Sequence, residues 1–126
     1  MVASVTEERV ISEAEADSLP IDVETISTTL GLVEDMSLST STREAIDTRT
    51  SELIGHLVLL QGQCLGEDQD EDVARLLRIV ERHLAPMDRP TSRSPAHEAF
   101  HFMHDTAVFV KALLSAYQEK NRNSTS

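Results

Sequence analysis

Apolar side chains recur every three or four residues between positions 42 and 65, and this spacing is the strongest constraint on the fold. An α-helix turns once in 3.6 residues, so such spacing places apolar groups on one side of a helix. The residues on that side are Ile46, Leu53, Leu57, Leu60 and Cys64. Ile54 and Val58 widen the stripe. Gly55 and Gly62 lie inside this helix at a cost in helix propensity, which indicates either close approach of a neighbouring helix or local fraying.

Three further segments carry the same helical spacing. A short helix follows Asp22, a third helix covers residues 71–84, and a last helix begins at Ser94 and Pro95 and runs to about Tyr117. The second helix begins at a capping box formed by Ser41 and Glu44. No segment alternates apolar and polar residues as a strand would. We therefore predict an all-α fold, a small antiparallel bundle of three to four helices.

The sequence divides into three regions. Residues 1–19 are rich in Glu, Asp, Ser and Ala and are expected to be a mobile acidic segment. Residues 20–120 form the helical bundle domain, and residues 121–126 a frayed tail. The single cysteine, Cys64, excludes an intramolecular disulfide. The chain shows neither a secretory signal nor a run of eighteen apolar residues, so we expect a cytoplasmic protein with no membrane association.

Charge is unevenly distributed along the chain, whose formal net charge is −11. Residues 1–81 hold 18 acids and 5 bases, whereas residues 82–126 hold 4 acids and 6 bases. The acidic part repels phosphate backbones, which disfavours direct binding of nucleic acid. The same charge leaves a weaker alternative, in which the acidic part mimics nucleic acid and blocks a DNA-binding protein.

One motif points to metal chemistry. His97, Glu98 and His101 match the HExxH string, in which two imidazoles one helical turn apart bind zinc and the glutamate activates the bound water. The third ligand would be His104, Asp105 or Glu119. On this alternative reading, the protein is a zinc-dependent hydrolase, a peptidase with Glu98 as its general base.

The position of the motif on its helix favours a solvent-exposed stripe over a site. The three histidines share an arc with Lys111, Ser115 and Glu119, while the opposite side carries the apolar residues that suit a core. The sequence also lacks a strand that would align a substrate. Our main prediction therefore assigns no catalytic residue, no metal and no cofactor.

Four stretches resemble a family of small, helical, uncharacterised actinobacterial proteins, a domain of unknown function. They are PIDVETI at 20–26, TSELIGHLVLL at 50–60, ARLL at 74–77 and VKALLSAY at 110–117. Some members are labelled as natural-product biosynthesis proteins. The resemblance implies a helical fold and a setting in specialised metabolism, and it assigns no catalytic residue. The HExxH string is not characteristic of the family.

These observations predict a non-enzymatic accessory or regulatory domain that offers a helical surface to a protein partner. The packed helical core and the acidic surface motivate this hypothesis. Apolar arcs on the second and last helices also suit self-association into a homo-oligomer.

Overall fold

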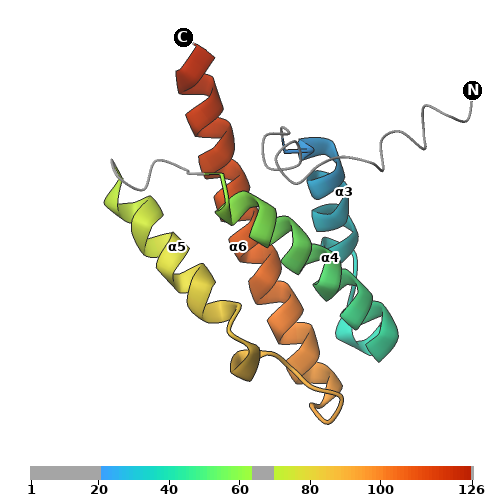
Figure 1. Cartoon of the computed structure of the whole chain (residues 1–126). Coiled ribbons are helices and arrows are strands. Elements are labelled where there is room, and N and C mark those ends of the chain that lie inside the picture. Colours follow the sequence, from blue (N-terminus) through green and yellow to red (C-terminus); the bar gives the residue numbers. More distant parts are fainter. Residues whose placement is uncertain (1–20, 64–69, 126) are drawn as a thin grey trace, which may run out of the picture.

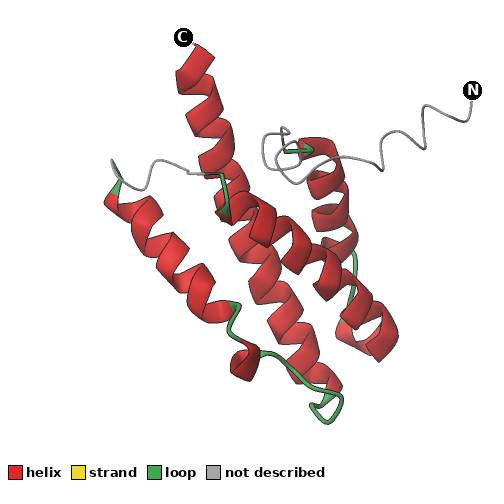
Figure 2. Ribbon diagram, in the orientation of Figure 1, coloured by secondary structure: helices red, strands yellow, loops and turns green. Residues whose placement is uncertain are grey.

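The computed structural model describes residues 21–63 and 70–125, which form four α-helices and no strand. The helices are α3 (Val23–Glu34), α4 (Arg43–Gln61), α5 (Glu71–His83) and α6 (Ala96–Thr125), with short 3-10 turns η1 (Leu38–Thr40) and η2 (Pro86–Asp88). Consecutive helices run in opposite directions (Figure 1), and short connections that contain η1 and η2 join α3 to α4 and α5 to α6 (Figure 2). The predicted small antiparallel helical bundle is confirmed. The predicted acidic segment 1–19 and Cys64 lie outside the described residues.

Helix α6 is the centre of the bundle. It contacts α3, α4 and α5, and its most extensive contact is with α4. The fully buried side chains come mainly from these two helices, as the apolar spacing predicts. They include Ile46, Leu53, Leu57 and Leu60 of α4 and Met103, Thr106, Val110 and Leu113 of α6. The bundle therefore has one core, built almost entirely from aliphatic side chains.

The starts of α3 and α4 follow the predicted capping chemistry, with one shift in α4. Helix α6 begins at Ala96, one residue after the predicted Pro95, and the Ser94 hydroxyl accepts from the Thr91 N–H instead of capping the helix. The Asp22 carboxylate accepts a hydrogen bond from the Thr25 N–H at 3.0 Å, as predicted. For α4 the cap is Thr42, not Ser41, and its hydroxyl accepts from the Ala45 N–H at 3.0 Å. The predicted Ser41–Glu44 capping box is wrong by one residue, and the residue three positions after Thr42 is Ala45, so the reciprocal glutamate of a capping box is missing.

Two helices end at different places from those predicted. Helix α4 stops at Gln61, because Gly62 caps it and donates its N–H to the carbonyls of Val58 and Leu60. Helix α6 continues to Thr125, past the predicted boundary at residue 120, and residues 121–125 contain neither Gly nor Pro to stop it.

Long-range hydrogen bonds join the chain ends and loops to the core. The Ile21 N–H donates to the Tyr117 hydroxyl at 3.2 Å, which ties the start of the bundle to α6. Lys120 Nζ donates to the Gln63 carbonyl at 2.7 Å, which ties the end of α4 to the same helix. No described helix has both the length and the apolar content needed to cross a membrane.

Candidate functional site

The histidine string lies on the exposed side of α6, as its spacing predicts. His97, His101 and His104 are all exposed, and so are Glu98 and the two other candidate ligands, Asp105 and Glu119. The His104 ring lies beside the Phe100 ring, with 5.1 Å between centroids. Within residues 21–63 and 70–125, no side chain covers them to form the dry cleft that metal-assisted hydrolysis requires.

The described residues do not assemble a metal-ligand set. Across residues 21–63 and 70–125, no three His, Cys, Asp or Glu side chains are grouped so that they could hold an ion. His97 and His101 share one helix, and no second element brings a ligand to them. The motif residues on which the zinc hydrolase hypothesis depends are therefore exposed on one helix and are not gathered in a site.

His83 has a structural position that the sequence did not reveal. Its Nε2 atom lies 2.8 Å from the hydroxyl of Thr106, which is fully buried. The Thr106 hydroxyl donates its only proton to the Phe102 carbonyl at 2.7 Å, so His83 Nε2–H is the donor in the other bond. The imidazole also stacks on the Phe102 ring at 4.3 Å. His83 therefore fastens α5 to α6.

His56 fastens α4 to α3 in a similar way. Its Nε2 atom lies 3.1 Å from the Thr29 hydroxyl, which also donates to the Thr25 carbonyl. Burial lowers the pKa of His56 below its ordinary value of 6.5, and the carboxylates of Glu52 and Asp22 partly oppose that shift. The neutral imidazole suits this contact, so His56 stabilises the bundle.

A cavity of about 310 Å³ lies between α4 and the connection from η2 to α6. Ile54 of α4 and Phe102 of α6 are among its lining residues, together with Arg43 and Arg89. Both arginines already hold backbone carbonyls. Arg43 donates to Ser94 O at 2.6 Å and Thr91 O at 2.7 Å. Their guanidinium groups therefore brace the loop, which disfavours an anion-binding site here.

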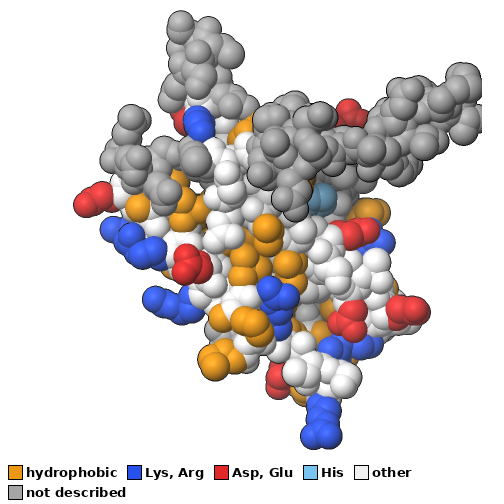
Figure 3. Space-filling model, in the orientation of Figure 1, with side chains coloured by type: hydrophobic (Ala, Val, Ile, Leu, Met, Phe, Trp, Pro, Cys, Tyr) orange, Lys and Arg blue, Asp and Glu red, His pale blue; other side chains and the backbone are white. Residues whose placement is uncertain are grey.

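The outward side of α4 carries two exposed apolar side chains among small residues. Val58 and Leu59 expose 50% and 55% of their surface, and the small residues Ser51, Gly55 and Gly62 are exposed beside them. We call these five residues the α4 outer face. Hydrophobic side chains gather over α4 in the middle of the surface that Figure 3 shows. The α4 outer face is the candidate functional site.

The exposure of Val58 corrects the sequence prediction, which placed it on the buried stripe. Val58 follows the fully buried Leu57 and is turned from it by about 100° around the helix axis. The contact with α6 covers only the narrower stripe of Ile46, Leu53, Leu57 and Leu60. Of the two residues predicted to widen the stripe, Ile54 is half-buried and Val58 faces outward.

No feature of the described residues requires a glycine at position 55. A Cβ atom built at Gly55 meets no described atom within 4 Å, and its backbone needs no conformation that other residues avoid. Glycine inside a helix costs about 1 kcal/mol relative to alanine. The sequence offered two reasons for a glycine here. The first, close approach of a neighbouring helix, is not met among the described residues. The second, local fraying, is not met at Gly55, because α4 stays helical through it.

No protein-family model, no curated protein and no solved structure matches this chain. The functional argument therefore depends on the residues of the α4 outer face and their surroundings.

Proposed function

We propose that this protein is a non-enzymatic accessory or regulatory interaction domain, and that its α4 outer face receives a helix of a protein partner. The observation that carries this proposal is Gly55, an open glycine in the middle of an exposed helix face beside Val58 and Leu59. The resemblance noted in the sequence adds a setting in natural-product biosynthesis to the same proposal.

The geometry of helix packing explains why a glycine helps here. Two helices normally pack with their axes about 8–10 Å apart, at a distance set by the side chains between them. A residue without a Cβ atom allows the backbones to come closer. A partner helix centred over Gly55 would also cover Val58 and Leu59. Because each exposes about half its surface, covering both contributes about 2 kcal/mol at the usual value for apolar burial.

The net charge favours a different protein over a second copy as the occupant. A symmetric dimer through the α4 outer face would bring together two chains that each carry a formal charge of −11. Such charge opposes self-association, although it also keeps a single chain soluble. A homo-oligomer is therefore an outcome of the test below and not the proposal.

Site-specific crosslinking tests this proposal. A photoreactive amino acid would replace Val58 in the native cell, and a control protein would carry it at the equally accessible His104 on α6. We expect one partner to be captured from position 58 and not from position 104. The purified partner should then bind the wild-type chain and Gly31→Ala equally, and bind Gly55→Ala at least about tenfold more weakly.

Gly31→Ala is a matched control because its new Cβ also meets nothing within 4 Å, on a helix that is not part of the site. Capture of second copies alone would contradict the proposal, and so would equal capture from both positions. Unchanged affinity of Gly55→Ala for the captured partner would contradict it as well.

A further inference from the structure

We infer that the partner helix is acidic, and that a row of three arginines on α5 recognises its carboxylates. The row consists of Arg75, Arg78 and Arg82, all exposed. This inference rests on the proposed function, because it assigns a charge to the helix that docks on the α4 outer face.

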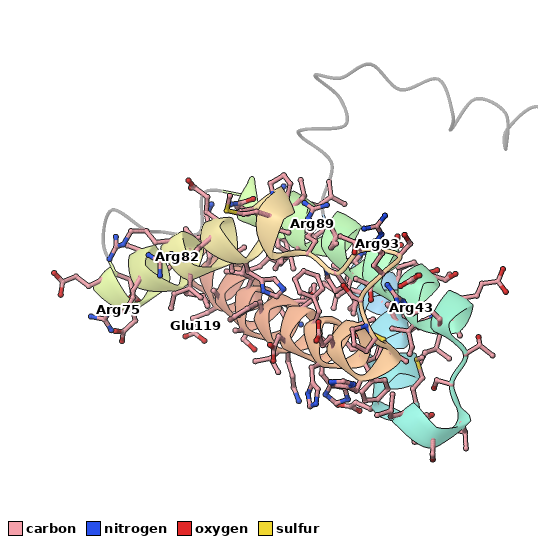
Figure 4. All side chains as sticks on the ribbon, turned by 90° about the horizontal axis from the view of Figure 1, so that it is seen from below. Arg43, Arg75, Arg82, Arg89, Arg93 and Glu119 are labelled. Carbon is pink, nitrogen blue, oxygen red and sulfur yellow. The ribbon has the colours of Figure 1, made fainter. Side chains whose placement is uncertain are left out.

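Helix α5 and the connection after it are less acidic than the rest of the chain. Residues 71–95 hold five arginines and four acids, a net charge of +1 in a chain of net charge −11, and the acids Glu71 and Asp72 are confined to the first turn of α5. Figure 4 shows Arg75, Arg82, Arg89 and Arg93 along α5 and the loop that follows it. Surface charges are screened beyond about 8 Å at physiological salt, so a partner at α5 is governed by these local arginines.

The three arginines point away from the core. They lie within an arc of about 60° on α5, because residues three and four apart share a helix face. The buried residues of the same helix, Leu77 and Val80, occupy its opposite side against α6.

Two of these arginines form no ion pair with a described residue, although the chain has twice as many acids as bases. Arg75 pairs with Asp72 at 3.3 Å, whereas Arg78 and Arg82 have no carboxylate of the described residues within the 4.0 Å of an ion pair. The acid nearest to both in sequence is Glu81 of α5. Neighbouring arginines on one face that pair with no described carboxylate are available to bind carboxylates of another molecule.

Helix α5 and the hydrophobic patch over α4 can both be reached from the face that Figure 3 shows. Basic side chains lie over α5 at the left of that view, with an acidic side chain between them and the hydrophobic patch. Ile79, which is 40% exposed, adds an apolar group among the arginines. A helix with small and aliphatic residues along one side and carboxylates along the next matches this arrangement. Nucleic acid matches it less well, because a phosphate backbone offers no aliphatic side chains to cover the exposed Val58 and Leu59.

A designed peptide tests the inference without the natural partner. The probe is a helical peptide of Glu, Ala and Leu with its apolar residues on one stripe, and its comparison replaces every Glu with Gln. We would measure fluorescence anisotropy at low and high salt, and follow amide and arginine Nε–H signals by NMR. The acidic peptide should bind at low salt, shift signals of Arg78 and Arg82, and bind more weakly as salt rises.

Matched charge variants decide whether the row is responsible. Arg78→Gln/Arg82→Gln should weaken binding of the acidic peptide about tenfold. The control, Arg49→Gln/Lys111→Gln, removes two positive charges from other parts of the bundle and should leave affinity within about twofold. Equal effects of the two double variants would overturn the inference. Tighter binding of single-stranded DNA than of the acidic peptide, through the same arginines, would overturn it in favour of nucleic acid.

The crosslinked partner separates this inference from the proposed function. If Gly55→Ala weakens binding of the partner and Arg78→Gln/Arg82→Gln does not, the inference that the partner helix is acidic is wrong, and docking on α4 stands. If the arginine variant weakens binding of the partner and Gly55→Ala does not, recognition by α5 stands, and the proposal that the partner docks on α4 is wrong.

Discussion

Replacing Gly55 with alanine should make the isolated protein more stable. The new methyl group meets no described atom within 4 Å, so it causes no clash, and the backbone at residue 55 is that of an ordinary helix. The gain is then the difference in helix propensity, about 0.8–1.0 kcal/mol. For a chain of 126 residues, this corresponds to a rise in Tm of about 4 °C.

Urea unfolding followed by circular dichroism measures this effect, with a higher midpoint and an unchanged slope as the expected result. An unchanged or lower midpoint would refute the reasoning, because it would show that Gly55 contributes to the stability of the free chain. A gain in stability combined with a loss of partner binding is the pattern expected when a residue is kept for function at a cost in stability. Gly31→Ala should change stability in the same direction and leave binding unchanged.

Three further predictions test the packing and the histidine contacts. Leu57→Ala should destabilise the bundle by about 2–5 kcal/mol, whereas Leu59→Ala, two residues along the same helix and 55% exposed, should change it by less than about 0.5 kcal/mol; urea unfolding compares them. Thr106→Val should cost about 1–2 kcal/mol because the imidazole bonded to its hydroxyl loses its acceptor. Thr50→Val loses only the bond to a backbone carbonyl and should cost clearly less, and equal costs would contradict the histidine contact. Burial lowers the pKa of His56 in the folded chain below 6.5. The stability that the buried neutral imidazole contributes is therefore fully present above pH 6.5. It is lost as the pH falls toward the folded-state pKa, because the unfolded chain then binds more protons than the folded chain. His56→Gln should flatten the loss of Tm between about pH 7 and pH 5, and an identical pH profile would refute this assignment.

The helical architecture could be predicted from the sequence because local signals specify it. The apolar spacing gave the buried residues of α4, and Asp22 gave the start of α3. The spacing could not give the width of the contact between helices, which depends on how α4 crosses α6. Val58 was therefore placed in the core, although it lies on the outer face.

Contacts between distant residues explain the rest of what the sequence did not show. Arg43 reaches carbonyls of Thr91 and Ser94, about fifty positions away along the chain, and His83 meets Thr106 across two helices. Neither pair leaves a periodic or spaced pattern. The glycines of α4 were the one sequence signal of the candidate site, and only the open space at Gly55 distinguished a docking face from internal packing.

The central claim is that this protein acts through the α4 outer face and not through chemistry at its exposed histidines. The most direct test is the affinity of the captured partner for two variants, Val58→Asp and His97→Ala/His101→Ala, measured by titration calorimetry with the metal content of each protein determined. We predict that Val58→Asp loses at least about tenfold in affinity, while the histidine variant binds as the wild type does. Unchanged binding by Val58→Asp, together with one zinc ion per chain that is lost with the histidines, would contradict the account.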